Sequence, residues 1–331
     1  MSSYKRVCVV GALPHPIGGV STYLSRLCQK VEVDVFLDLY PFCKKSIDGL
    51  KIKDYRVSPF KGPSKYFWLV YQLMIIRANL VVYNFSTLKA LFPLLILPKF
   101  SERYHCVLHN GAPFLGIKVS SNIFVQLLLR KVDCFFSLNK TQSVFFRSNN
   151  INYKNYKSYV PIIAPLTDKV NNNKVILSGY PTDIYNFLWI EKIAPDYENL
   201  EFDIYVYGEG YGEQAAILAK RMNKISNVRV YRDTNPDEFL KKLTNASYYI
   251  RLNSVDSFGI VVADSVNLGL KVLASNCCER YPGAYLFNSD CYFSFESAFR
   301  NLVNGNFLQL RSQKSKYDYS NGYKMVIEDQ G

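Results

Sequence analysis

Histidine and closely spaced cysteine are scarce in this chain. Its 331 residues include three histidines, and its eight cysteines are scattered without a Cys-x-x-Cys pair. No Asp-x-Asp sequence occurs either. Protein metal centres draw on such clusters of His, Cys and carboxylate ligands, so the sequence predicts a protein without a bound metal. The adjacent Cys277 and Cys278 have a poor geometry for an ordinary disulfide, which indicates a reduced protein with buried thiols.

Long apolar stretches are also lacking. No stretch reaches the roughly 18 consecutive apolar residues of a membrane-spanning helix, and the most apolar segments, Tyr66–Ile76 and Leu88–Leu97, are interrupted or too short. Residues 1–6 carry the charge of a signal peptide, but the apolar run Val7–Ala12 is too short for its core, and no cleavage site of small residues follows. We therefore expect a cytoplasmic protein.

Acidic residues are rare in the first half of the chain. Residues 1–165 hold 22 Lys and Arg against 7 Asp and Glu, a net charge of +15, whereas residues 166–331 hold 18 against 20, a net charge of −2. A well-solvated surface is one explanation. The other is attraction to a polyanion, namely an anionic membrane face, a lipid pyrophosphate or a nucleic acid. Because no recognisable nucleic-acid-binding motif accompanies the charge, we favour the membrane and expect no nucleic acid partner.

Apolar strands alternate with helices along most of the chain, which is typical of a parallel sheet covered on both faces. The amino-acid composition changes between Tyr156 and Asn173, where prolines and asparagines indicate a linker. We therefore expect an α/β protein of two Rossmann-like domains, residues 1–165 and 166–331, with the last 15 residues or so able to pack back on the first domain. The predicted strands are Arg6–Gly11, Glu32–Leu39, Lys51–Val57, Leu80–Asn84, Tyr104–His109, Asp133–Ser137, Lys174–Gly179, Glu201–Tyr207, Val228–Tyr231, Tyr248–Leu252 and Lys271–Ser275. The predicted helices are Ser21–Lys30, Ser64–Asn79, Leu88–Leu97, Asn122–Lys131, Thr141–Arg147, Ile184–Ala194, Gln214–Asn223 and Pro236–Thr244, and a further helix ends at Gly269.

Two carboxylates stand eight positions apart in the second half. Asp256 precedes the turn Ser257-Phe258-Gly259, which opens an apolar helix, and Asp264 lies about two turns inside that helix. Two acids so placed can address two parts of one ligand, while the N–H groups at the helix N-terminus can receive an anion between them. A nucleotide-sugar has this shape, with a hydroxylated sugar, a diphosphate and a ribose.

Further motifs stand in order along the chain. They are Pro14 with Gly18-Gly19-Val20, His109-Asn-Gly111, Gly208-Glu-Gly210, Asp256 with Asp264, and the loop from Ser275 to Arg280. With these motifs the chain resembles the retaining glycosyltransferases of the GT-B fold, specifically family 4 (group 1), over nearly its whole length. The resemblance implies two Rossmann-like domains whose parallel sheets face an interdomain cleft, with the nucleotide-sugar on the second domain and the acceptor on the first.

Two departures from the family pattern concern the diphosphate. Both family glutamates are aspartates here, and the usual Arg and Lys after the first strand of the second domain are replaced by the segment Gly179–Asn186. Arg251 and Arg280-Tyr-Pro282 resemble a family 4 subgroup that carries arginines at these two points. Our hypothesis is that Arg251 and Arg280 bind the diphosphate through the bidentate geometry of the guanidinium group. The alternative is a pair of surface arginines.

The resemblance also implies roles for single residues. His109 would hydrogen-bond the donor sugar near the reaction centre, Asp256 the hydroxyls of the transferred sugar, and Asp264 the ribose hydroxyls. The alternatives are a structural histidine, a helix N-cap and an exposed helix position. Backbone N–H groups would approach the donor at Gly18, Gly19, Gly179, Gly208, Gly210, Ser257, Phe258 and Gly259, several of which are equally explained as turn residues.

We therefore expect a metal-independent, retaining hexosyltransferase that needs no cofactor. Its donor would be a UDP- or GDP-linked sugar, and its acceptor a saccharide, polyprenyl-linked, in the synthesis of bacterial surface polysaccharide such as O-antigen, capsule or exopolysaccharide. The enzyme would lie at the inner face of the cell membrane as a peripheral protein. The segment Pro63–Arg77, aromatic and flanked by lysines, suits a membrane-interface anchor or a core helix.

Two other functions remain open. A sugar-nucleotide epimerase can have the same two-domain shape, but it needs acid and base carboxylates in the first domain, which has only seven acids and none in an obvious site. A non-catalytic protein that binds anionic lipid or nucleic acid through the basic half would leave the motifs of the second half unexplained. Turnover with an acceptor excludes the binder, and product analysis separates transfer from epimerisation.

Overall fold

The protein consists of two compact units. The computed structural model describes residues 6–14, 18–41, 47–109, 123–162, 173–208, 210–306 and 318–327. Unit 1 comprises Met1–Pro161 together with Tyr317–Gly331, and unit 2 comprises Ile162–Lys316. The boundary predicted from the sequence, between residues 165 and 166, lies four positions further along the chain. The chain thus completes unit 2 and then returns to unit 1.

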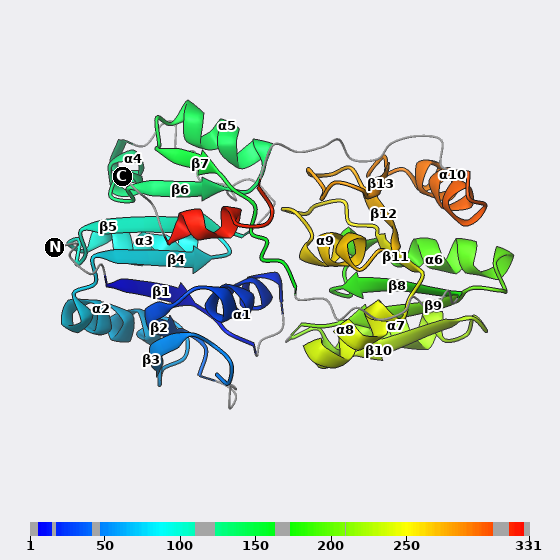
Figure 1. Ribbon diagram of the computed structural model, residues 1–331, viewed down its shortest axis with the longest axis horizontal. Helices are drawn as coiled ribbons and strands as arrows, with labels where there is room; N and C mark the ends of the chain where they lie inside the picture. The colour runs from blue at the N-terminus through cyan, green and yellow to red at the C-terminus, as the bar shows by residue number, and fades with distance from the viewer. Residues whose placement is uncertain are drawn as a thin grey trace. The chain divides into compact units, whose positions relative to one another are not determined.

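Unit 1 is built on a seven-stranded sheet in the order β3-β2-β1-β4-β5-β6-β7, and all of its strand pairs are parallel (Figure 1). Its central strands β1, β2 and β4 are buried along their whole length. Burial on both faces explains why β1 and β4 are mostly apolar, whereas β2 also carries the buried acids Asp34 and Asp38. The strands are β1 Val7–Gly11, β2 Val33–Asp38, β3 Ile52–Val57, β4 Leu80–Phe85, β5 Arg103–Leu108, β6 Cys134–Ser137 and β7 Tyr153–Asn155.

Helices cover both faces of this sheet. The chain crosses from β1 to β2 in one direction and from β3 through β4 to β7 in the other, so right-handed crossovers place α1 on one face and α2 to α5 on the opposite face. The C-terminal 3-10 helix η4 (Gly322–Val326), red in Figure 1, lies on the α1 face, where the Val326 carbonyl is 2.8 Å from Nδ1 of His105. The helices are α1 Gly19–Lys30, α2 Ser64–Ile76, α3 Leu88–Ile96, α4 Ile123–Leu129 and α5 Lys140–Ser148.

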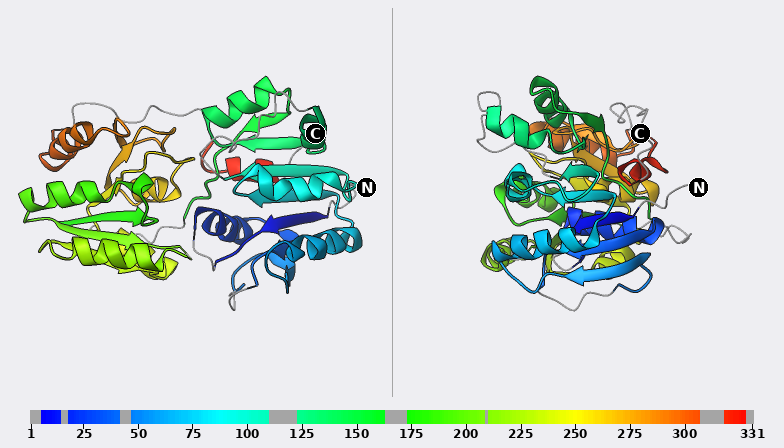
Figure 2. Two further views of the ribbon diagram at one scale, coloured as in Figure 1. Left: turned by 180° about the vertical axis from the view of Figure 1, so that it is seen from behind. Right: turned by 90° about the vertical axis from the view of Figure 1, so that its left-hand side faces the viewer.

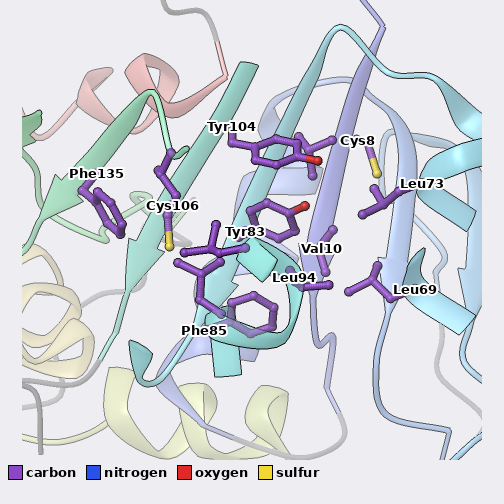
Figure 3. Close-up of a cluster of buried hydrophobic side chains, with 14 of the residues drawn as sticks. Cys8, Val10, Leu69, Leu73, Tyr83, Phe85, Leu94, Tyr104, Cys106 and Phe135 are labelled. Atoms are coloured by element: carbon purple, nitrogen blue, oxygen red, sulfur yellow. The ribbon is translucent and has the colours of Figure 1, made fainter. Parts of the chain in front are cut away.

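The core of unit 1 lies between the sheet and α2 to α5. Figure 3 shows Val10, Tyr83 and Cys106 of the sheet facing Leu73 of α2 and Leu94 of α3. Alternate residues of each strand point into this core, because side chains alternate between the two faces of a strand.

Unit 2 is built on a six-stranded parallel sheet in the order β10-β9-β8-β11-β12-β13. Helices α6, α7 and α10 pack on one face, and α8 and α9 on the other (Figures 1 and 2). The strands are β8 Lys174–Gly179, β9 Glu201–Val206, β10 Val228–Arg232, β11 Tyr248–Arg251, β12 Lys271–Ser275 and β13 Tyr285–Phe287. The helices are α6 Leu188–Ile193, α7 Gly212–Met222, α8 Pro236–Thr244, α9 Ile260–Asn267 and α10 Tyr292–Val303, with 3-10 turns η2 Asp183–Tyr185 and η3 Ala194–Asp196.

The predicted fold class, two Rossmann-like units with parallel sheets, is confirmed. One predicted helix is wrong in detail, because Ile184–Ala194 is not continuous. Asn186 adopts a left-handed conformation (φ 49°) after η2, and its side chain donates a hydrogen bond to the Leu252 carbonyl at 3.0 Å. The α-helix begins only after this interruption. Within the described residues, no helix is long and apolar enough to cross a membrane.

Candidate active site

Arg251, Asp256 and Arg280, three of the predicted site residues, lie together at the carboxyl edge of the unit 2 sheet. The chain runs from β8 to β9 and β10 in one direction and from β11 to β13 in the other, so the strand order reverses between β8 and β11. Open parallel sheets bind ligands outside the carboxyl ends of their strands at such a switch point. Gly179 ends β8 and Arg251 ends β11, and these two residues therefore flank the reversal.

Asp256 lies between the two predicted arginines. Its Oδ2 accepts hydrogen bonds from Nε of Arg251 at 3.1 Å and from Nη1 of Arg280 at 2.7 Å, and its Oδ1 accepts one from the Ser257 amide at 2.9 Å. Burial alone would raise the pKa of the Asp256 carboxyl, but the two guanidinium groups outweigh burial and hold that pKa well below its ordinary value. Asp256 is therefore ionised, and the N-cap position of α9 belongs to Gly259 instead.

Arg280 is buried and uses its whole guanidinium group within the protein. Nε donates to the Ser275 carbonyl at 2.9 Å, and Nη1 donates to Asp256 and, at 3.0 Å, to the Phe258 carbonyl. Nη2 donates to Oγ of Ser275 at 3.0 Å and to Sγ of Cys277 at 3.4 Å. A guanidinium group has five N–H donors, and these five contacts occupy them. Arg280 thus holds together the loop of Asp256 and the end of β12.

Gly259 fits this cluster only because it lacks a side chain. Its φ of +82° favours glycine, and a Cβ atom there would lie 2.7 Å from Nη1 of Arg280 and 3.2 Å from Oδ2 of Asp256. Asp264 follows within α9 and is 2% exposed. The exposed helix position that we considered for Asp264 is therefore excluded.

Arg251 is held from two further sides. Its Nη1 donates to the Ser178 carbonyl at 2.9 Å, and its guanidinium carbon lies 5.1 Å from the ring centroid of Tyr185. The Tyr185 ring covers Gly179 so closely that a Cβ atom on Gly179 would overlap it. The surface arginines that we considered as an alternative are excluded, because Arg251 and Arg280 are both buried.

Sequence reasoning missed a cluster of tyrosines beside Arg251. The Tyr180 ring lies 4.9 Å from Tyr207, 5.5 Å from Tyr211 and 5.7 Å from Tyr185, between ring centroids. Burial is the main cause that raises the pKa of Tyr180 to about 12, so its phenol is neutral. The signal in the sequence is that Tyr180 directly follows Gly179, the last residue of a predicted strand.

The remaining predicted glycines of unit 2 differ in their surroundings. Gly208 has a φ of +122°, and a Cβ atom there would lie 2.5 Å from Cδ1 of Tyr180, so this glycine accommodates the tyrosine cluster. Gly210 has a φ of +85° and no atom within 4 Å of such a Cβ position. Glu209 lies outside the described residues. Gly210 is thus the one of the pair that leaves open space beside the backbone.

Two guanidinium groups face one carboxylate in the cluster of Arg251, Asp256 and Arg280. Among the residues that the structure describes, Asp256 is the only carboxylate in an ion pair with Arg251 or Arg280, so the three side chains together have a net charge of +1. The first backbone hydrogen bond of α9 runs from the Val262 amide to the Gly259 carbonyl at 3.0 Å, and the amides before it have no partner within the helix. Buried cations beside a helix N-terminus suit an anion such as a phosphate group.

His109 lies in unit 1 at the end of β5. Its Nε2 is 3.2 Å from Oδ1 of Asn84, and its ring centroid is 5.3 Å from that of Tyr23, whose hydroxyl is 2.6 Å from the Tyr156 hydroxyl. Burial lowers the pKa of His109 from 6.5 to about 3. The imidazole is therefore neutral near pH 7, and it can donate or accept a hydrogen bond but does not supply a positive charge. Asn110 and Gly111 of its motif lie outside the described residues.

Gly18 and Gly19 open helix α1 at the other switch point, between β1 and β4. The first backbone bond runs from the Thr22 amide to the Gly18 carbonyl at 3.0 Å, and a Cβ atom on Gly19 would meet nothing within 4 Å. Residues 15–17 of this loop lie outside the described residues. Among the residues that the structure describes, no neighbouring atom therefore requires a glycine at position 19.

Within the described ranges, no group of three or more His, Cys, Asp or Glu side chains lies close enough together to hold a metal ion. Metal independence remains a prediction of the sequence.

Comparison with known proteins shows the fold. No family model matches the chain, and no curated protein matches it. Among solved structures, Anabaena Alr3699/HepE in complex with UDP and glucose superposes with a TM-score of 0.70 at 10% identity, covering 92% of this chain and 91% of its own. The lipopolysaccharide outer core galactosyltransferase WaaB in its apo form gives 0.61 at 13% identity, covering 97% and 94%. Sucrose-phosphate synthase (tll1590) from Thermosynechococcus elongatus gives 0.67 at 12% identity, with the same coverage. The chain has the GT-B fold of these proteins.

Proposed function

We propose that this protein is a glycosyltransferase that takes a sugar from a nucleotide-diphosphate donor. The observation that carries the proposal is the buried cluster of Arg251, Asp256 and Arg280, with its net charge of +1, at the switch point of the unit 2 sheet. The fold similarity supports it, since HepE was solved with UDP and with UDP-glucose, and WaaB is described as a galactosyltransferase. A UDP-linked donor is therefore the first to test.

Arg251 and the first amides of α9 would neutralise the diphosphate. Arg280 would act chiefly as a positioning residue, because its N–H donors already hold Asp256 and the Phe258 carbonyl. Asp256 retains lone pairs for the hydroxyls of the transferred sugar, and buried Asp264 would bind the ribose hydroxyls. Preorganised charges of this kind stabilise the negative charge that develops on the leaving group.

The proposed reaction retains the anomeric configuration. The bond between the anomeric carbon and the diphosphate oxygen breaks, and the acceptor hydroxyl oxygen bonds to that carbon on the same face. The acceptor proton passes to the departing phosphate oxygen, so no additional base is needed. The single N–H of neutral His109 points to Oδ1 of Asn84, so its Nδ1 would accept a hydrogen bond from a hydroxyl of the donor sugar. Neither metal nor cofactor takes part in these steps.

The acceptor would be a lipid-linked saccharide of bacterial surface-polysaccharide synthesis, bound by unit 1. The net charge of +15 in residues 1–165 supports this assignment, because a lipid pyrophosphate and the anionic membrane that holds it both attract a basic surface. The enzyme would then work as a peripheral protein at the inner face of the cell membrane.

Thermal unfolding in the presence of UDP, GDP, ADP and CMP tests the donor site. A true ligand at a hundred times its dissociation constant stabilises the protein by about 2.7 kcal/mol. We expect one nucleoside diphosphate to raise the Tm of the wild type and of Glu198→Gln, an exposed acid of unit 2, but not of Asp264→Asn. The absence of a shift with every nucleotide would contradict the proposal and favour the non-catalytic binder. Sugar transfer to an acceptor, rather than inversion of the free donor sugar, distinguishes the enzyme from an epimerase.

A further inference from the structure

Helix α2 is apolar on the side that faces away from the core. Its buried residues Leu69, Leu73 and Ile76 pack against the sheet. On the opposite side Phe67 is 81% exposed and is followed at helical spacing by Tyr71, Met74 and Ile75, each of which is at least half exposed. The outer side of a surface helix is ordinarily polar, so this side has the composition of a contact surface.

The apolar surface continues onto neighbouring helices. Helix α3 contacts both α2 and α4, and all three contribute to the core cluster on one face of the unit 1 sheet. The exposed side chains of α3 and α4 include Ile96, Ile123 and Leu127. We define the docking face as the residues Phe67, Tyr71, Met74, Ile75, Ile96, Ile123 and Leu127. Exposed large apolar side chains on three adjacent helices are typical of an interaction site.

The surroundings of the docking face are basic. Residues 61–150 hold 11 Lys and Arg against only Glu102 and Asp133. Helices α2 to α5 contain no acid at all. Arg77 at the end of α2, Lys89 in α3 and Arg130 after α4 are exposed. An apolar surface ringed by cations complements an anionic lipid surface, whereas two copies of the same basic face would repel each other.

We propose that the docking face inserts into an anionic lipid bilayer and that the surrounding Lys and Arg contact its headgroups. This inference rests on the proposed function in that it names the surface by which the enzyme would reach a lipid-linked acceptor. The contact needs no membrane-spanning helix, because each apolar side chain enters only the outer part of the bilayer.

Co-sedimentation with vesicles tests the proposal. We expect the wild type to bind vesicles of phosphatidylcholine with phosphatidylglycerol at low salt, and to bind phosphatidylcholine alone at least about tenfold more weakly. The double variant Phe67→Ser/Ile123→Ser should lose about tenfold or more in affinity for the anionic vesicles. Phe293→Ser/Ile217→Ser is the matched control, because both residues are exposed apolar side chains of unit 2 and Phe293 is 77% exposed. Serine leaves the charge unchanged, so the comparison isolates apolar contact.

Several outcomes would overturn the docking face. These are an absence of vesicle binding by the wild type, equal binding to neutral vesicles, or equal losses in the two double variants. Analytical ultracentrifugation gives another, since a dimer that Phe67→Ser/Ile123→Ser dissociates would identify a second copy as the occupant. A nucleotide-dependent Tm shift without vesicle binding would contradict the docking face alone. Vesicle binding without any nucleotide shift would contradict the proposed enzyme and leave the docking face standing.

Discussion

At the scale of single residues, the charge balance around Asp256 dominates the candidate site. One carboxylate faces two guanidinium groups, and the side chain of Asp256 is 11% exposed. A buried charge is tolerated only when it is paired and hydrogen-bonded. Asp256 therefore stabilises the fold in addition to its proposed contact with a sugar. A substitution at this position affects both stability and sugar binding.

Replacing Asp256 by asparagine should destabilise unit 2. The variant keeps the shape of the side chain but leaves Arg251 and Arg280 buried without a countercharge, which costs about 3 to 5 kcal/mol in comparable cases. Urea unfolding of Asp256→Asn against the wild type measures this loss, with Glu198→Gln as the control for an exposed acid. A loss no larger than that of the control would mean that the ion pairs contribute little to folding.

Alanine substitutions at Gly259 and Gly305 distinguish the cost of backbone strain from the cost of a steric clash. Both have a positive φ, of +82° and +73°, but only at Gly259 would a Cβ atom meet Arg280. Alanine in the left-handed region costs about 1 to 2 kcal/mol by itself. We expect Gly259→Ala to lower the Tm clearly more than Gly305→Ala. Equal shifts in a thermal unfolding experiment would show that the Arg280 side chain yields without cost.

His109 should make stability depend on pH in the acidic range. Its folded pKa of about 3 lies below the ordinary value of 6.5, so between these pH values the unfolded chain binds a proton that the folded chain does not. The contribution of neutral His109 to the free energy of unfolding is fully present above pH 6.5. It is lost as the pH falls towards 3, by up to about 1.4 kcal/mol per pH unit. Urea unfolding at pH 7, 6 and 5 should give a shallower dependence for His109→Gln. Parallel curves would contradict the burial of a neutral imidazole.

At the scale of secondary-structure elements, burial decides what a sequence pattern can predict. The strands next to the switch points, such as β1 and β8, are apolar along their length because helices cover both sides, and the pattern finds them. Strands β7 and β13 have three residues each, too few for a pattern. The break at Asn186 was missed because its cause, a side-chain bond to the Leu252 carbonyl, joins residues 66 positions apart.

The same reasoning limits the prediction of the site. Arg251 and Arg280 could be expected to converge, because each lies at or after the carboxyl end of one of two neighbouring strands, β11 and β12. That both bond to one oxygen of Asp256 could not be foreseen, since it depends on the loop conformation that Gly259 permits. The tyrosine cluster was missed because aromatic packing over glycine leaves no fixed spacing in the sequence.

At the scale of the whole molecule, the charge and the apolar surface belong to the same unit. The basic first half and the docking face both lie in unit 1, whereas the arginine cluster lies in unit 2. Lipid contact and nucleotide binding can therefore be altered separately by mutation. This separation is what allows the vesicle and nucleotide experiments to fail independently.

The return of the chain to unit 1 gives another prediction. Removal of residues 318–331 takes away the Val326 carbonyl beside His105 and the Tyr319 ring, whose centroid lies 6.4 Å from that of Tyr159. We expect a lower Tm for unit 1 and an unchanged Tm for unit 2, resolved as two transitions by calorimetry. A nucleotide-induced shift that persists in the truncated chain would serve as the internal control for unit 2. A single unchanged transition would mean that this segment adds no stability.

The position of η4 also sets an order of events on the ribosome. Every residue of unit 2 leaves the exit tunnel before η4 does, although η4 belongs to unit 1. Domains generally fold as they emerge, so the strands of unit 1 emerge early in synthesis, whereas η4, which contacts His105 of that sheet, emerges only after the whole of unit 2. Unit 1, which is translated first, is therefore completed last. A chaperone that binds nascent chains would protect the His105 side of its sheet for the longest time.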